Sequence, residues 1–345
     1  MLYILVINSK GRAVFSFIKW LEENFNKLKL NKGLWFTTIT TLSIVGIFTA
    51  MYYLNTMTDR ASESVYSKAR EDFLASLENK IATKNNFLIS NAAILASYPL
   101  INSTLRTKNP KAMKQLSDYI QNVQEKLLSL NGIEVAIALY DQNLTQVSQV
   151  NFDPLTEMRI GVKDRFGINL AQKEKVPIVG IEKEGNYVYS RAFAPILLAD
   201  GTVNGMIEFS QKIRVFQPIM ENESKEYLFL LNKTELIDVS LRTSEIFSEI
   251  GDDFAAYEGV YNEYFYSNLT TVDFDLLFDQ GYFIDENFYT TYKFVEDIEG
   301  QVIGVMIFGE NTKTSSSVVN LTEDITRSVT TIALALVVSL VILLF

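Results

Sequence analysis

Two uncharged hydrophobic stretches bracket a long polar middle part of the chain. The first, residues 34–54, would span about 31 Å as a helix with a rise of ~1.5 Å per residue, which matches the hydrocarbon core of a bilayer. Trp35 lies near one end and Tyr52 and Tyr53 near the other, as is typical of aromatic side chains at membrane interfaces. The second stretch, residues 329–345, covers about 25 Å, the short limit of the spanning range. We therefore predict two transmembrane helices.

The first stretch could also be a signal peptide, but a signal peptide has a shorter apolar core of ~7–15 residues, so we favour a span. No lysine or arginine follows the second stretch, and we expect further residues beyond Phe345 in the complete protein.

Apolar positions between 56 and 105 recur at helical spacing, and no proline or glycine interrupts them before Pro99. This pattern predicts a long stalk helix that continues from the first span. A second helix is expected from Lys111 to Leu130, between Pro110 and the stop signal at Asn131 and Gly132. Residues 311–328 also keep helical spacing and lead into the second span.

After Gly132 the apolar spacing becomes typical of strands. Strands are expected at 133–140, 144–150, 187–195 and 203–210, the last two forming a hairpin around Asp200 and Gly201. Between them, Asp164 is expected to cap a short helix that ends at Glu174.

A repeat follows in the second half, where strands are expected at 227–231, 292–298 and 302–309. Residues 300–308 align with residues 201–209 at a constant offset of 99, and the residues that coincide are Gly201, Val203, Gly205 and Phe209 with Gly300, Val302, Gly304 and Phe308. We interpret this as two copies of one α+β module. Two unrelated hairpins are the alternative.

The charge distribution predicts the orientation in the membrane. Residues 1–34 carry six cations and two acids, whereas the whole chain has a net charge of −10 and the spans are neutral. Cationic flanks stay in the cytoplasm, so the acidic middle is expected outside. Its charge argues against nucleic acid as a partner.

The chain has no histidine and no cysteine, which removes the usual general base and most transition-metal ligands, so we expect no metal, no cofactor and no enzymatic activity in these residues.

The predicted hairpin carries a candidate binding site. Strand alternation places Tyr187, Tyr189 and Arg191 on one face. Centring the hairpin on its turn places Glu208 opposite Phe193 and diagonal to Arg191. Arginine can hold a carboxylate with two hydrogen bonds, and a carboxylate accepts from an amine, so this face suits a small polar ligand. A cross-strand ion pair that needs no ligand is the alternative. Arg165, on the short helix expected over the sheet, and Glu182 complete the candidate set.

This order of elements resembles the double Cache sensors of bacterial chemoreceptors, sensor kinases and cyclic-dinucleotide enzymes, and most of all their third type, over about residues 55–328. The residues that carry the resemblance are Arg165, Val179–Glu182, Tyr187–Arg191, Pro195 and Gly205–Phe209. The resemblance implies two PAS-like modules, a homodimer packed along the stalk helix, and ligand binding in the membrane-distal module. In the second module no arginine matches Arg191, and Ile307 replaces the glutamate, which fits a module that transmits instead of binding.

The expected organisation is an α+β chain with a long N-terminal stalk helix and two antiparallel-sheet modules, flanked by two transmembrane helices. Its segments are a cytoplasmic part at 1–33, a span at 34–54, the stalk helix at 55–108, the distal module at 109–215, the proximal module at 216–312, a juxtamembrane helix at 313–328 and a span at 329–345. Residues 1–33 could form an interfacial amphipathic helix, and a disordered or misannotated leader is the alternative. The acidic segment 249–300 matches no calcium-binding loop, and we interpret its aromatic residues as core of the proximal module.

These features predict the sensing part of a transmembrane signal transducer of the bacterial inner membrane, with its main domain periplasmic or extracellular. We expect a chemotaxis-type receptor that binds an amino acid, an organic acid or an amine. The input domain of a histidine kinase or diguanylate cyclase is an alternative, as is a membrane-tethered accessory protein without an output domain.

Overall fold

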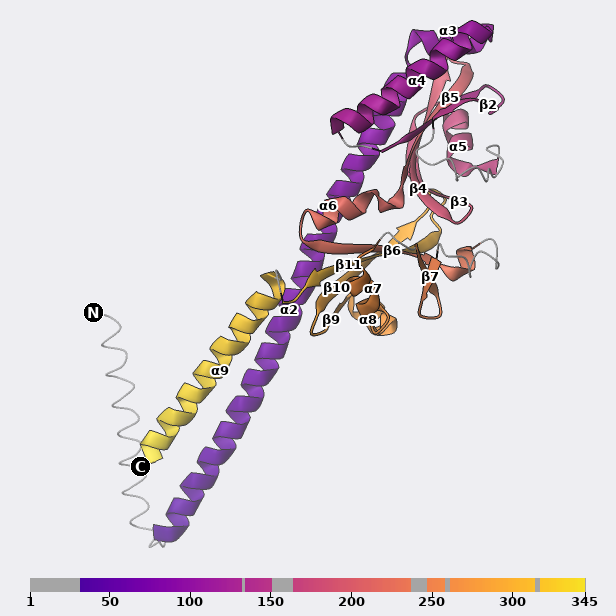
Figure 1. The fold of residues 1–345 in the computed structure, drawn as a ribbon. Coiled ribbons are helices and arrows are strands. Elements are labelled where there is room, and N and C mark those ends of the chain that lie inside the picture. Colours follow the sequence, from indigo (N-terminus) through magenta and orange to yellow (C-terminus); the bar gives the residue numbers. More distant parts are fainter. Residues whose placement is uncertain are drawn as a thin grey trace, which may run out of the picture. The chain divides into compact units, whose positions relative to one another are not determined.

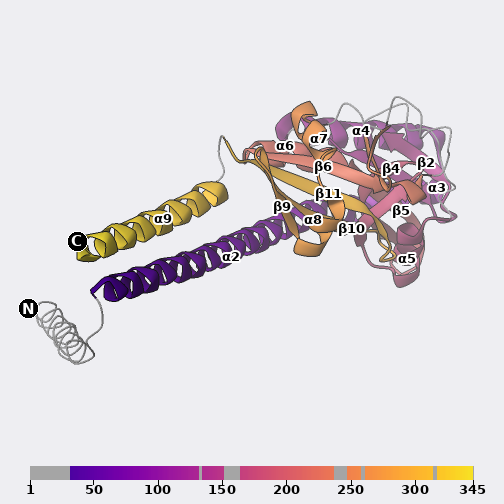
Figure 2. The same cartoon turned by 90° about the horizontal axis from the view of Figure 1, so that it is seen from below.

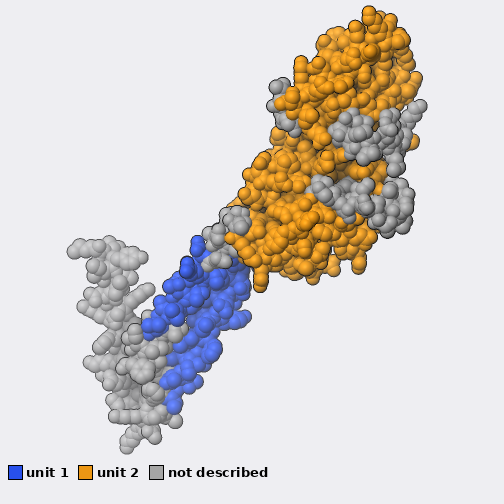
Figure 3. All heavy atoms as spheres, in the orientation of Figure 1, with its two compact units in different colours: residues 1–65, 320–345 blue, residues 66–319 orange. Residues whose placement is uncertain are grey.

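The computed structural model of the chain describes residues 32–131, 134–150, 164–236, 247–257, 261–313 and 317–344 (Figure 1). The amphipathic helix expected within residues 1–33 lies outside these ranges. The chain divides into two compact units, one of Met1–Val65 with Asn320–Phe345 and one of Tyr66–Val319 (Figure 3).

The first unit contains the beginning of helix α2 (Lys32–Ala96) and most of helix α9 (Ser317–Leu344). Both helices expose large apolar side chains there, among them Phe48, which is 69% exposed, and Leu334, which is 66% exposed. Within the ranges that the structure describes, no helix combines the length and the hydrophobicity needed to cross a membrane. The two spans at 34–54 and 329–345 therefore remain predictions.

The stalk helix expected at 55–108 is interrupted. Helix α2 ends at Ala96, and helix α3 (Pro99–Thr107) begins with a proline at its first turn. Tyr98 has an extended backbone (φ −73°, ψ 121°), because the ring of the following proline disfavours the helical conformation of the residue before it. Helix α4 (Pro110–Asn131) follows and agrees with the second helix that the sequence predicts.

The first module is built on a five-stranded antiparallel sheet with the order β2-β1-β5-β4-β3. Its strands are β1 (Ala136–Asp141), β2 (Gln146–Val150), β3 (Ile178–Glu184), β4 (Tyr187–Leu197) and β5 (Val203–Lys212). Helix α5 (Phe166–Glu174) lies between β2 and β3 in the chain.

The second module has a six-stranded antiparallel sheet with the order β7-β8-β6-β11-β10-β9. Its strands are β6 (Lys225–Asn232), β7 (Phe247–Ile250), β8 (Phe254–Tyr257), β9 (Tyr282–Ile284), β10 (Phe288–Glu296) and β11 (Val302–Asn311). Its helices are α7 (Glu263–Leu269) and α8 (Phe274–Gln280). A single turn of 3₁₀-helix (Ile213–Phe216) and the short helix α6 (Gln217–Glu221) connect the two modules, and a second such turn (Lys233–Glu235) follows β6.

Apart from the additional edge strand β7 of the second sheet, the two modules share their strand order, and their hairpins share their register. In the first hairpin Arg191 pairs with Ser210, and in the second Thr290 pairs with Gly309, which is the same pair displaced by 99 residues. The irregularity after Ile196 in β4 recurs after Val295 in β10, again 99 residues later. The repeat predicted from the glycine, valine and phenylalanine positions is therefore a repeat of structure.

Each sheet has two buried faces, as strand alternation requires. In the first module Ile137 and Leu139 pack with helices α2, α3 and α4, whereas Ala138 and Tyr140 pack with Ile168 of helix α5. Figures 1 and 2 show α4 and α5 on opposite sides of this sheet.

The second sheet is covered in the same way. Phe229 and Phe308 pack with Leu77 of helix α2 on one face. Leu230 and Ile307 pack with helices α7 and α8 on the other. The aromatic residues of the acidic segment, among them Phe265, Phe274 and Phe278, belong to this second core, as the sequence predicts.

Candidate functional site

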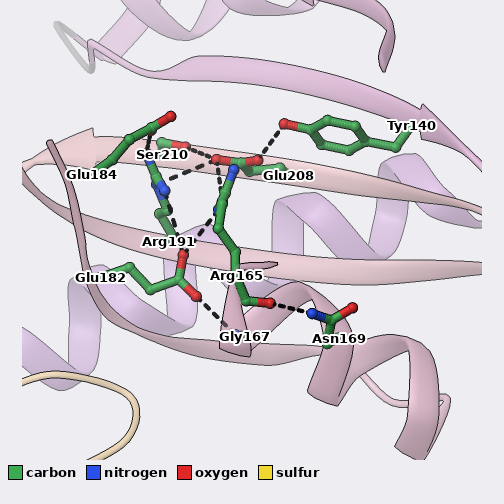
Figure 4. A network of polar contacts seen from close by, with 9 residues as sticks. All are labelled: Tyr140, Arg165, Gly167, Asn169, Glu182, Glu184, Arg191, Glu208 and Ser210. Carbon is green, nitrogen blue, oxygen red and sulfur yellow. Dashed lines mark hydrogen bonds and ion pairs between the residues drawn. The ribbon is translucent and has the colours of Figure 1, made fainter. Parts of the chain in front are cut away.

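The polar residues of the first module gather on the sheet face that helix α5 covers (Figure 4). Strands β3, β4 and β5 contribute Glu182, Glu184, Arg191 and Glu208, and Arg165 immediately precedes α5. We call these five residues the charge cluster. Three carboxylates against two guanidinium groups give the cluster a formal charge of −1.

The start of helix α5 is held by the sheet. Arg165 is the N-cap residue and makes no capping hydrogen bond with its side chain, so the cap expected at Asp164 is wrong. Instead, the Gly167 N–H donates to Glu182 Oε1 over 2.8 Å. A side chain at Gly167 would place its Cβ 2.5 Å from that oxygen, so only glycine allows this approach. A carboxylate from strand β3 therefore takes the role of the missing cap.

The hairpin of β4 and β5 has the register predicted from its turn, with Phe193 opposite Glu208 and Arg191 opposite Ser210. This register leaves Arg191 diagonal to Glu208, and Arg191 Nε lies 3.3 Å from Glu208 Oε1. The ion pair that the sequence offers as an alternative to ligand binding is thus present, as one contact of a larger network.

Glu208 accepts from several sides. The Tyr140 hydroxyl donates to Oε2 over 2.7 Å, and the Ser210 hydroxyl donates to Oε1 over 2.7 Å. Arg165 Nη2 lies 3.0 Å from Oε1. Glu208 is only 4% exposed, so these contacts replace the water that its carboxylate would otherwise bind.

Glu182 joins the two arginines. Arg165 Nε donates to Glu182 Oε2 over 3.3 Å, and Arg191 Nη1 donates to the same oxygen over 3.4 Å. Arg191 Nη2 is paired with Glu184, whose side chain is 19% exposed and is the most accessible of the cluster. The charge cluster is therefore closed on the side of Glu208 and reaches solvent at Glu184.

One nitrogen of each guanidinium group lies in an ion pair but makes no well-directed hydrogen bond among the described residues. Arg165 Nη2 and Arg191 Nε are buried and have Glu208 Oε1 within ion-pair distance, yet neither finds a hydrogen-bond partner of favourable geometry among the described residues. Buried donors without a well-directed acceptor are uncommon in folded proteins.

Burial and charge together set the ionisation of the cluster. Burial by itself raises the pKa of the Glu208 carboxyl, but Arg165 and Arg191 outweigh it and lower this pKa to about 2. Burial lowers the pKa of each guanidinium, and the carboxylates reverse this and raise it above the usual value. Burial, followed by the charge of Glu208, raises the pKa of the Tyr140 phenol, so this hydroxyl stays a donor.

The other two candidates lie beside the cluster. The Tyr189 side chain is buried, and Arg191 Cζ lies 4.5 Å from the centre of its ring, a cation–π geometry. Tyr187, at the beginning of β4, has Lys212 Nζ at 5.8 Å from its ring centre. Sequence reasoning missed Tyr140 and Glu184 as site residues. Glu184 shares a strand face with Glu182, which is a usable signal, whereas Tyr140 is found only once β1 is known to pair with β5.

No family model matches the sequence, and no curated protein does. The chain is similar to bacterial sensor domains in its fold. The ligand-binding domain of the Campylobacter jejuni chemoreceptor Tlp3, solved with L-valine, is 12% identical, with 79% of this chain and 98% of that chain covered and a TM-score of 0.41. The sensor domain of the Vibrio cholerae histidine kinase DctB is 9% identical, with 71% and 98% covered and a TM-score of 0.39. The Escherichia coli DcuS sensor domain is 21% identical, with 39% and 93% covered and a TM-score of 0.28.

The second module of this chain provides an internal reference for the charge cluster. The residue equivalent to Glu208 is Ile307, and the residue equivalent to Arg191 is Thr290. Leu230 takes the place of Tyr140, because strands β1 and β6 pair with β5 and β11 in the same register. The same sheet face is thus built without these charges, so the fold itself does not require them.

The low pKa of Glu208 predicts a pH dependence of stability. Because this pKa lies below the usual value of 4.5, the stabilisation is complete above about pH 4.5 and is lost as the pH falls towards 2. A shift of this size corresponds to a loss of about 2 kcal/mol between pH 7 and pH 3. Urea unfolding of the parent and of Glu208→Gln at both pH values measures it, and the difference between the two proteins is expected to shrink at pH 3. The same comparison with Glu78→Gln, an exposed carboxylate, is the control, and an equal difference at both pH values would contradict the assignment.

Proposed function

We propose that this chain is the sensing part of a bacterial transmembrane signal transducer, in which a small polar molecule binds at the charge cluster of the first module. The observation that carries the proposal is the contrast between the modules. One copy of the fold holds a group of five charged residues, of which all but Glu184 are buried. In the other copy, neutral residues occupy the positions equivalent to Arg191 and Glu208. Buried charge is costly for stability, so its presence in only one copy favours a role in binding.

The chemistry of the cluster favours a ligand with both an acceptor and a donor. Arg165 Nη2 and Arg191 Nε can donate to a carboxylate or carbonyl oxygen. The cluster has one more carboxylate than guanidinium groups, and Glu184 is its most accessible carboxylate. Glu184 can accept a hydrogen bond from an amine. Amino acids, organic acids and amines are the classes that offer these groups. The C. jejuni chemoreceptor domain has been solved with L-valine and with 4-methylisoleucine, so amino acids are tested first.

The proposal includes the two membrane spans, a periplasmic main domain, a homodimer and a chemotaxis-type output. The exposed apolar side chains on the beginning of α2 and on α9 support the spans, because a contiguous exposed apolar surface marks a membrane or protein contact. These side chains include Leu42, Val45, Phe48, Ile332 and Leu334. Protease accessibility of the chain in oriented membrane vesicles tests the spans and the orientation, and chemical cross-linking tests the dimer.

Ligand binding is tested with the full chain in detergent. A ligand of one of the three classes is expected to raise the melting temperature, since binding to the folded state at about 100 times Kd adds roughly 2.7 kcal/mol of stability. Arg191→Lys keeps the charge but loses the planar fork, and we expect it to weaken binding by at least about tenfold in calorimetry.

Arg106→Lys, at an exposed position of helix α3, is the matched control and is expected to bind like the parent. Equal affinity of Arg191→Lys and the parent, or no stabilisation by any of the three classes, would overturn the assignment of the site.

A further inference from the structure

The hairpin turn of the second module touches the first module close to the charge cluster. Ile298, between β10 and β11, donates its backbone N–H to the Ile181 carbonyl over 2.8 Å. The Ile298 side chain packs against two glycines of the first module and occupies space that a side chain at either glycine would need. A Cβ at Gly180 would come 2.9 Å from Ile298 Cγ1, and a Cβ at Gly167 would come 3.0 Å from Ile298 Cδ1.

Both glycines belong to the environment of the charge cluster. Gly180 pairs with Arg191 across strands β3 and β4, and the Gly167 N–H donates to Glu182. A movement of Arg191 or Glu182 would therefore displace the surface on which Ile298 rests. The contact is part of a wider one, because Ile181 packs against the core that contains Val295 and Ile303, on either side of the turn.

Among the residues that the structure describes, the equivalent turn of the first module shows no such contact. The residue 99 positions before Ile298 is Ala199, and it is exposed. Both turns have the same internal hydrogen bond. The Leu198 N–H donates to the Thr202 carbonyl in the first module, and the Asp297 N–H donates to the Gln301 carbonyl in the second. The turn itself therefore needs no isoleucine, and the side chain of Ile298 serves the contact between the modules.

We infer that Ile298 is the coupling residue through which a change in the charge cluster of the first module reaches strands β10 and β11 of the second. The inference rests on the proposed function, to which it adds the route of the signal. Packed side chains with no free space transmit displacement, because the contact cannot deform without cost. In the chain, β11 is the last strand before helix α9, so this route ends at the segment that leads towards the second predicted span.

The test needs no ligand, because a substitution serves as the perturbation. Glu182→Gln in the full chain in detergent removes the charge that holds Gly167 and both arginines. Hydrogen exchange is then followed by mass spectrometry in peptides from α5 and from β10 and β11. With Ile298 present, exchange in both regions is expected to become faster by about three- to tenfold. In the Ile298→Ala background, the effect of Glu182→Gln is expected to persist in α5 and to disappear in β10 and β11.

Val302→Ala truncates an exposed apolar side chain of the same hairpin and is the matched control, with the coupling expected to be unchanged. Ile298→Val replaces Ile298→Ala if the latter does not fold, with a partial loss of coupling expected. Gly180→Ala forces Ile298 away and is expected to lower the melting temperature, and the double variant Gly180→Ala with Ile298→Ala is expected to recover it.

An equal effect of Glu182→Gln on β10 and β11 with and without Ile298, or no effect there in either background, would overturn the inference. Neither outcome depends on finding a ligand, so a failure of the proposed function and a failure of this coupling can be told apart.

Discussion

Replacing Arg191 by methionine is expected to lower the free energy of unfolding by about 3–5 kcal/mol, the usual cost of removing one partner from a buried ion network. Methionine keeps much of the volume, so the loss reports charge more than packing. Without Arg191 the cluster holds three carboxylates and only Arg165, and Glu182 and Glu208 are both buried. Urea unfolding at pH 7 measures the effect.

A second substitution separates this network from independent contacts. Glu208→Gln keeps an acceptor for the Tyr140 hydroxyl and restores the formal charge of the cluster to −1. The double variant is therefore expected to lose no more than Arg191→Met alone. The exposed ion pair of Lys293 and Glu78, at 3.0 Å, is the control cycle, with a coupling of less than about 1 kcal/mol. If the losses in free energy of unfolding of the two single variants add up to that of the double variant within about 0.5 kcal/mol, Arg191 and Glu208 act independently.

Alanine at Gly205 or at Gly304 is expected to cost about 3 kcal/mol or more, the upper range for overpacking, because the added atom meets backbone that cannot rotate away. A Cβ at Gly205 would lie 2.4 Å from the backbone carbonyl oxygen of Tyr140, and a Cβ at Gly304 would lie 2.3 Å from the backbone carbonyl oxygen of Leu230. Tyr140 and Leu230 are equivalent positions of β1 and β6, so the two variants test one structural requirement twice. Thermal and urea unfolding of each single variant provide the measurement.

Gly46 supplies the control, since nothing lies within 4 Å of an added Cβ and the residue is within helix α2. Gly46→Ala is expected to be neutral or slightly stabilising, because alanine favours the helix over glycine. A cost at only one of Gly205 and Gly304 would mean that the two modules use the repeated glycine differently.

The repeat gives one sheet design two interiors. On the face covered by α5 the first module places charged residues beside apolar ones. On the equivalent face of the second module Ile307 packs with Phe265 of helix α7. Burial of apolar side chains is favourable and gives a rigid interior. Buried charged side chains depend on their ion-pair and hydrogen-bond partners, so they can respond to an additional partner such as a ligand. This difference supports a binding role for the first module and a transmitting role for the second.

Local patterns in the sequence determined a large part of this fold. The α+β class, helix α4, the hairpin register around Asp200 and Gly201, and the offset of 99 between the modules all follow from periodicity and turn chemistry. Strand alternation also placed Arg191 and Glu208 within reach of each other. These features depend on residues close together in the chain, where spacing alone fixes direction.

Only the tertiary structure decided which distant segments meet. Strand β1 pairs with β5 and brings Tyr140 to Glu208 across 68 residues. The approach of Gly167 to Glu182 replaces the local cap expected at Asp164. The contact of Ile298 with Gly180 joins the modules across more than one hundred residues. Periodicity tells which face a residue occupies but not which strand or turn lies beside it, because that choice is made by the packing of the whole sheet and its helices.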